Sequence, residues 1–297
     1  MEMTVKLGTR ASRLALVQTE TVASLLAASF PAIDIPVVRV TTEGDADRTT
    51  PLADFGGRGA FVRSIENALL EMRVDAAVHS LKDLPSGLPE GLILAATPER
   101  IDPRDALVAR DGACLRELPE GSIVGTGSER RSSQLAEVRP GLVFRGIRGN
   151  VETRLRKLDD GEYDAVILAA AGLVRLDLAS RITEYLDVDD VLPAPCQGII
   201  GIECRQHDDE TEEIIRTIDN GDIRRCAETE RAFIRTLGMG CHAPVGAYAT
   251  IEGSDILFRA FVMPEGGSTP LKETISAAGD VIIPAAERLA RKFRNKL

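Results

Sequence analysis

The chain has 297 residues, 44% of them hydrophobic and 28% charged, and its formal net charge is −10. This length and composition predict a globular protein of two or three domains and exclude the disordered and membrane-spanning classes. With no signal-peptide pattern and no apolar run of about 18 residues, we expect a cytoplasmic protein without a membrane partner. The negative charge argues against a nucleic-acid partner, because phosphate binding normally leaves a basic footprint.

The five cysteines are odd in number, widely spaced and without a C-x-x-C pair, so they predict neither a disulfide framework nor a metal site. Cys241 stands apart, because Gly238 and Gly240 precede it and Pro244 follows it. These residues place it on a loop after a helix predicted at 226–236. The local pattern fits an inert buried thiol as well as an exposed reactive one.

Only six of the 36 basic residues are lysine, and the arginines gather beside glycine-rich turns. Guanidinium groups bind carboxylates and phosphates through two parallel hydrogen bonds. The arginine clusters therefore indicate a small polycarboxylate or phosphate ligand.

In chain order, the first predicted unit is a short strand at 4–9, followed by an amphipathic helix that Ser12 precedes. Arg10 and Arg13 lie in the intervening loop, beside the unpaired N–H groups of the helix N-terminus. This arrangement predicts an anion site, and a capped surface helix with solvated arginines is the alternative.

A strand at 35–41 and a helix at 60–72, entered through a glycine-rich turn, lead to a buried strand at 75–79. Lys82 and Asp83 follow its carboxyl end, where open α/β sheets place their chemistry. The alternative is a solvated turn.

Residues 122–132 repeat the order of strand, Gly-Thr turn, arginines and helix, with the helix starting near Ser132. A strand and loop at 144–149, a helix at 150–158, a strand at 164–169 and a polar turn from Arg175 follow. Because the turn at 125–126 resembles the turn at 8–9, we expect two domains of one architecture.

The stretch 193–198 should cross back, so that the apolar stretch 199–204 completes the first domain. The remainder is a small α/β unit with a helix at 226–236, strands at 247–251 and 256–262, and a helix at 285–296. The alternation of strands and helices predicts an α/β fold with parallel or mixed sheets. The predicted domains are 1–99 plus 197–217, 100–196, and 218–297.

Three segments carry a resemblance to a known family: HSLKDLP at 79–85, RGNVETR at 148–154, and the Cys241 loop. In this order, and over nearly the whole chain, the sequence is similar to the porphobilinogen deaminase family. The resemblance implies a monomeric cytosolic enzyme that joins four porphobilinogen molecules into hydroxymethylbilane with loss of ammonia, in tetrapyrrole biosynthesis. It also implies two domains that resemble type-2 periplasmic binding protein domains and face a cleft, and a third, small domain that carries the cysteine.

The resemblance also implies site residues. Asp83 matches the catalytic aspartate, for which we expect general acid/base and electrostatic roles. Cys241 matches the cysteine that holds a dipyrromethane cofactor through a thioether. The other cofactor-binding residues implied are Lys82, Ser128, Arg130, Arg131 and Arg154. The substrate-binding residues implied are Arg10, Ser12, Phe61, Thr126, Arg148, Arg175 and Gln197. No metal is expected, and a core phenylalanine is the alternative for Phe61.

Four residues depart from the family pattern: Arg13, Cys196, Met239 and His242. Cys196 adds a second candidate thiol at a position where glycine is common. The competing function is a two-domain anion-binding protein, such as a solute receptor or a LysR-type effector module, whose arginines bind a carboxylate without chemistry. The extra C-terminal cysteine domain counts against it.

Overall fold

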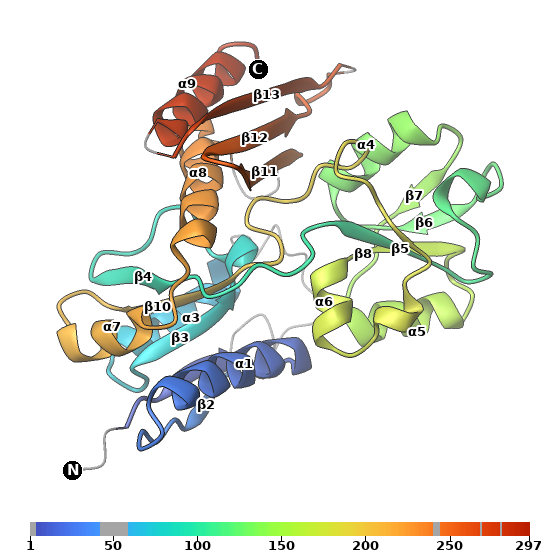
Figure 1. The fold of residues 1–297 in the computed structure, drawn as a ribbon. Helices are drawn as coiled ribbons and strands as arrows, with labels where there is room; N and C mark the ends of the chain where they lie inside the picture. The colour runs from blue at the N-terminus through green and yellow to red at the C-terminus, as the bar shows by residue number, and fades with distance from the viewer. Residues whose placement is uncertain (1–3, 42–58, 240–243, 268, 280) are drawn as a thin grey trace. The chain divides into compact units, whose positions relative to one another are not determined.

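The structure, a computed structural model, describes residues 4–41, 59–239, 244–267, 269–279 and 281–297, without the side chains of 59–61. Three β-sheets and the helices that cover them make up this part of the chain (Figure 1), which confirms the predicted α/β class. The chain divides into two compact units, Met1–Arg100 with Ile199–Arg225 and Ile101–Gly198 with Cys226–Leu297. The three-domain division stays a prediction, and each predicted domain contains one of the sheets.

A five-stranded mixed sheet in the order β2-β1-β3-β10-β4 forms the first unit. Its strands are β1 (Leu7–Arg10), β2 (Val37–Val40), β3 (Ala76–Ser80), β4 (Leu92–Ala96) and β10 (Ile200–Arg205). β1 runs parallel to β2 and β3, whereas β10 is antiparallel to β3 and β4. The late strand β10 therefore completes the first sheet, as the sequence predicts.

Helices cover both faces of this sheet. They are α1 (Arg13–Ser29), α3 (Gly59–Leu70) and α7 (Asp209–Arg216), with a short 3-10 helix, η1 (Leu81–Asp83), after β3. Val78 of β3 packs in one core with Val22 and Leu26 of α1, whereas Ala77 packs in another core with Ile65 of α3. Successive strand residues point to opposite faces, so β3 is buried on both sides, and its apolar sequence follows from that.

The second unit contains a sheet with the same plan, in the order β7-β6-β8-β5-β9. Its elements are β5 (Asp105–Ala109), η2 (Leu115–Glu117), β6 (Ile123–Gly125), α4 (Glu129–Val138), β7 (Val143–Arg145), α5 (Val151–Asp159), β8 (Ala165–Ala169), α6 (Ala170–Arg175), η3 (Ala179–Arg181) and β9 (Glu184–Tyr185). β6 runs parallel to β7 and β8, and β5 is antiparallel to β8. A Cβ added at Gly8 or at Gly125 would lie 2.9 Å from a neighbouring side chain. The two sheets therefore share both strand order and a tightly packed glycine, which confirms the predicted likeness.

The third sheet also belongs to the second unit and is antiparallel throughout, in the order β11-β12-β13. Its elements are α8 (Gly221–Leu237), β11 (Val245–Glu252), β12 (Asp255–Val262), β13 (Leu271–Ala278) and α9 (Ile282–Arg294). Phe233 of α8 packs against Phe258 and Phe293, with ring centroids 5.3 and 6.0 Å away. The Phe233–Phe293 pair is edge-to-face, with an interplanar angle of 84°, and such a pair adds to the stability that burial provides.

Several predicted elements are wrong in detail. α4 begins at Glu129, three residues before the predicted start, because the arginines of this turn form the buried first turn of the helix. Arg175 ends helix α6 and does not open a polar turn. The third sheet is neither parallel nor mixed, since short connections join its strands as hairpins.

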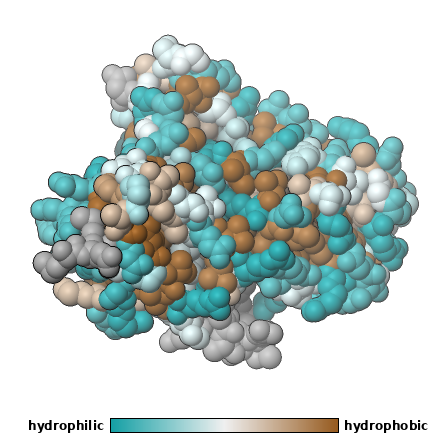
Figure 2. Space-filling model, turned by 60° about the horizontal axis from the view of Figure 1, so that its bottom comes forward, coloured by the Kyte–Doolittle hydropathy of each residue, from teal (hydrophilic) through white to brown (hydrophobic). Residues whose placement is uncertain are grey.

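The face drawn in Figure 2 is largely hydrophilic, with apolar residues in smaller patches. Such patches are ordinary, because polar side chains cannot cover a folded surface completely. Within the described ranges, we find no helix whose length and apolar content would suffice to span a membrane.

Candidate functional site

A cavity of about 90 Å³ in the first unit brings together three of the predicted site residues. Its polar lining consists of Arg10, Ser12, Gln18, His79, Ser80 and Asp83. Lys82 lies beside Asp83 in η1. The cavity thus contains a cation, hydroxyl groups and a carboxylate, which can bind an anionic ligand and move a proton.

The topology of the sheet explains this gathering. β1 ends at Arg10, and its parallel neighbour β3 ends at Ser80, so both carboxyl ends meet at one edge of the sheet. Ligands bind at this edge in open α/β sheets. Ser12 caps α1 by accepting a 3.4 Å hydrogen bond from the backbone N–H of Ala15, which aims the helix N-terminus at the same place.

Three polar residues of the cavity were not among the predicted site residues: Gln18, His79 and Ser80. The amide of Gln18 donates to Ser80 Oγ at 2.8 Å, and Ser80 Oγ donates back to Gln18 Oε1 at 3.0 Å. Gln18 is buried on the apolar stripe of α1, four residues before Val22. A glutamine inside such a stripe is the sequence signal that could have identified it.

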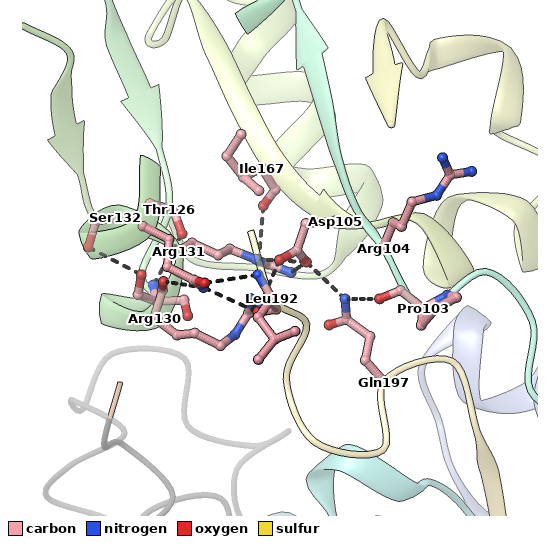
Figure 3. Close-up of polar contacts among 12 residues, drawn as sticks. Pro103, Arg104, Asp105, Thr126, Arg130, Arg131, Ser132, Ile167, Leu192 and Gln197 are labelled. Carbon is pink, nitrogen blue, oxygen red and sulfur yellow. Dashed lines mark hydrogen bonds and ion pairs between the residues drawn. The ribbon is translucent and has the colours of Figure 1, made fainter. Parts of the chain in front are cut away.

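A second cluster, in the second unit, is centred on Asp105 at the start of β5 (Figure 3). Arg130 Nη2 lies 2.8 Å from Asp105 Oδ2, and Arg131 Nη2 lies 2.7 Å from Oδ1. Gln197 Nε2 approaches Oδ1 from another side at 2.9 Å, while Arg104 points away. Arg130, Arg131 and Gln197, all predicted ligand-binding residues, therefore bind the protein's own carboxylate.

The two arginines also hold backbone carbonyl groups. Arg130 Nη1 donates to Leu192 O at 2.6 Å, and Arg131 Nη1 donates to Ile167 O at 3.1 Å. Both arginines are buried, with 4% and 8% of their surface exposed. These two arginines and the single aspartate together carry a net positive charge.

Asp105 is fully buried, and sequence reasoning did not identify it as a site residue. Burial alone would raise the pKa of the Asp105 carboxyl, but Arg130 and Arg131 outweigh burial and hold this pKa well below its usual range. Asp105 is therefore ionised at neutral pH and fixes the orientation of both guanidinium groups.

The remaining predicted anion-binding residues lie at helix ends. Thr126 Oγ1 accepts from the backbone N–H of Ser128, the N-cap of α4, at 3.2 Å. Arg154 Nε donates to Gly149 O at 2.9 Å in the first turn of α5, and Arg148 is exposed just before that helix. Arg175 Nη2 donates to the backbone carbonyl of residue 198 at 3.0 Å. Helix N-termini with arginines nearby suit anionic groups.

The predicted attachment residue Cys241 and the side chain of Phe61 lie outside the described parts of the chain. Cys196, the second candidate thiol, is buried, and its Sγ lies 3.8 Å from Ala227 O. Its φ of +60° belongs to the left-handed region, which explains why glycine suits this position. Among the described cysteines only Cys114 is exposed.

The buried carboxylate of Glu230 links the crossover segment, residues 193–198, to the third sheet. Glu230 of α8 accepts from the backbone N–H of Cys196 at 2.5 Å and from that of Ala249 in β11 at 2.7 Å. The backbone N–H of Ala247 in turn donates to Pro193 O at 3.1 Å. The same crossover holds Gln197 against Asp105, so the arginine cluster and β11 are fastened to one segment.

The described ranges contain no group of three or more His, Cys, Asp or Glu side chains that could hold a metal ion.

Comparison with known proteins gives a consistent result. Residues 5–213 match the family model "Porphobilinogen deaminase, dipyromethane cofactor binding domain", and residues 224–297 match "Porphobilinogen deaminase, C-terminal domain". A porphobilinogen deaminase of Syntrophotalea carbinolica is 48% identical over 92% of this chain and 87% of its own length. One of Roseiflexus castenholzii is 49% identical over 88% of this chain and 86% of its own length.

Solved structures give weaker likenesses. The VFT2 domain of Bordetella pertussis BvgS is 16% identical with a TM-score of 0.44, and covers 72% of this chain and 86% of its own. The methionine-binding protein MetQ is 13% identical with a TM-score of 0.44, and covers 72% of this chain and 89% of its own.

Proposed function

The chain belongs to the porphobilinogen deaminase family, and from that premise we propose that Asp83 is the general acid and base of its reaction. The enzyme condenses porphobilinogen into hydroxymethylbilane, in tetrapyrrole biosynthesis. An anion-binding receptor without chemistry, the competing hypothesis, does not fit a chain that matches both domains of this family.

The observation that carries the proposal is the shared cavity of Asp83, Arg10 and Ser12. The amino group of the porphobilinogen side chain must leave as ammonia, and the methylene carbon that carried it forms the new carbon–carbon bond. The attacking ring carbon must then lose a proton. A carboxylate at the end of β3 can hold that proton and stabilise positive charge on the ring. Arg10 is positioned in the same cavity for an acetate or propionate group.

The hydrogen-bond donors of the second unit fit the dipyrromethane cofactor of this family, because the cofactor carries carboxylates. The N-termini of helices α4 and α5 offer N–H groups, hydroxyl groups and guanidinium groups to such carboxylates. When bound, the cofactor supplies the pyrrole primer. We assign its anchoring to Ser128, Arg130, Arg131 and Arg154 with Lys82, and substrate binding also to Thr126, Arg148, Arg175 and Gln197. We assign Phe61 as the aromatic residue that lies next to the reacting pyrrole ring.

Turnover of Asp83→Asn tests the assigned role. We expect ammonia release to fall by roughly 100-fold or more, the lower range for general acid–base catalysis, with the fold retained. Asp75→Asn is the matched control, because Asp75 lies just before β3 at its opposite end and pairs with Arg205 at 3.3 Å. Turnover of Asp83→Asn equal to that of the control would reject the role.

Attachment of the cofactor at Cys241 is tested by intact mass. The wild-type protein should be heavier than its sequence by a two-pyrrole adduct, and Cys241→Ser should lack that adduct. Cys114→Ser is the control, since Cys114 is an exposed thiol elsewhere. An adduct that survives in Cys241→Ser, or an unmodified active enzyme, would contradict the attachment.

The proposal includes a cytoplasmic monomer of three domains. Sedimentation of the holoenzyme should give a single species near the 32.0 kDa chain mass. A dimer that persists on dilution would overturn the monomer.

A further inference from the structure

A buried histidine–carboxylate pair lies at the cavity. His79 Nε2 is 2.8 Å from Glu203 Oε2. His79 faces Gly201 across the β3–β10 ladder, and Glu203 faces Ala77. Because Gly201 has no side chain and Ala77 has only a methyl group, the imidazole and the carboxylate can meet diagonally on one face of the sheet.

The imidazole is the member of the pair that reaches the cavity. The side chain of His79 is 5% exposed and lines the cavity with Asp83, whereas the side chain of Glu203 is 0% exposed. Since Nε2 is turned toward Glu203, Nδ1 is the ring nitrogen left to exchange a proton with the cavity. At 2.8 Å the Glu203 carboxylate is near enough for its negative charge to stabilise the imidazolium that forms when His79 accepts a proton.

A third titratable group adds to the cluster. Glu66 of α3 is 5% exposed, and burial first, then the charge of Glu203, raises the pKa of Glu66, while His79 and Arg63 act in the opposite direction. Without bound protons, two carboxylates and one imidazole would place two negative charges in a buried site, which is costly. The cluster is therefore built to hold a proton next to the cavity.

We propose that His79, oriented by Glu203, is a second proton-transfer group of the Asp83 cavity. This inference rests on the proposed function of that cavity. When the new carbon–carbon bond has formed, the attacking ring carbon still carries its hydrogen. The C–H bond breaks, its electron pair returns to the ring, and the proton passes to His79 Nδ1, directly or through Asp83. Glu203 stabilises the imidazolium, which then gives the proton to the released ammonia or to water.

A purely structural pair would have different consequences. It would hold β3 to β10, and its loss would lower stability without altering the isotope effect on the chemical step. The charged groups around His79 come from other elements. Glu203 on β10 pairs with it, Glu66 on α3 interacts with its charge, and Arg10 on β1 and Asp83 in η1 line the same cavity. The test must therefore separate changes in proton transfer from changes in folding.

The experiment measures kcat and KM for the holoenzyme from pH 5 to 9, with porphobilinogen that carries deuterium or hydrogen at the bond-forming ring carbon. In His79→Gln we expect kcat to fall roughly 100-fold, KM to stay unchanged, and a primary isotope effect to increase. In Glu203→Gln the imidazole loses the anion beside it, so kcat should fall, KM should stay unchanged, and the primary isotope effect should increase.

Two controls match these variants. His207→Gln removes an exposed histidine, and Asp219→Asn breaks an ion pair with Arg224 in the same unit, away from the cavity. Neither should change kcat or the isotope effect. If His79→Gln and Glu203→Gln both match these controls while Asp83→Asn is inactive, the inference fails and the proposed function stands. If Asp83→Asn keeps its turnover while His79→Gln loses it, the assignment of Asp83 fails instead.

The wild-type holoenzyme offers a test that needs no folded variant. The chain has three histidines, so nitrogen-15 NMR of labelled histidine can follow each ring. The neutral imidazole of His79 should carry its proton on Nε2, which faces Glu203. A proton on Nδ1 would overturn the proposal, because that nitrogen could not then accept one from the cavity.

Discussion

Replacement of Asp105 by asparagine tests how the arginine cluster is held together. Asp105 is fully buried between Arg130 and Arg131, whose side chains are 5% and 9% exposed. Asparagine keeps the shape but removes the charge, so two guanidinium groups stay buried without their counterion. Breaking a buried pair in this way costs about 3–5 kcal/mol, which lowers Tm by roughly 10 °C for a chain of this size.

Urea and thermal unfolding of Asp105→Asn would measure this cost. The matched control is Asp102→Asn, three residues earlier, where the partner Arg104 is 40% exposed and the pair is worth about 1 kcal/mol or less. The pKa of Asp105 is depressed, so its contribution is fully present above the unfolded value of about 3.9 and is lost only as the pH falls through the folded value. If Asp105→Asn and Asp102→Asn lost equal unfolding free energy at pH 7, the buried ion pairs would not have the strength argued for them.

Three further changes have definite expected outcomes. Gly198→Ala should lower the free energy of unfolding in urea by about 2–5 kcal/mol. The φ of Gly198 is +88°, and the new Cβ would lie 2.4 Å from Ile101 O. A variant as stable as the wild type would contradict this. Glu230→Gln should lower the free energy of unfolding in urea by about 1.5–3 kcal/mol, since its carboxylate accepts from Ala249 N at 2.7 Å. Glu66→Gln should raise Tm at pH 8, with the gain vanishing near pH 4, because burial and Glu203 raise the pKa of Glu66 and its ionised form opposes folding.

Much of the fold was readable from local patterns. The strand at 75–79, the cap at Ser12 and the apolar run at 199–204 predicted β3, α1 and β10 within a few residues. These elements depend on burial on both faces and on capping, which adjacent residues determine. β13 was not predicted, because its side chains alternate between half-buried and exposed and therefore give a weak signal.

The sequence by itself determined which residue types could serve an anionic ligand, and it placed Asp83 and Arg10 at strand ends that parallel pairing brings together. Only the tertiary structure decided what lies around them. It set Asp105 against Arg130 and Arg131, although 25 residues separate Asp105 from Arg130, and it set Glu203 against His79 across an antiparallel ladder. Such pairs depend on strand order and burial, and neither quantity is a property of neighbouring residues.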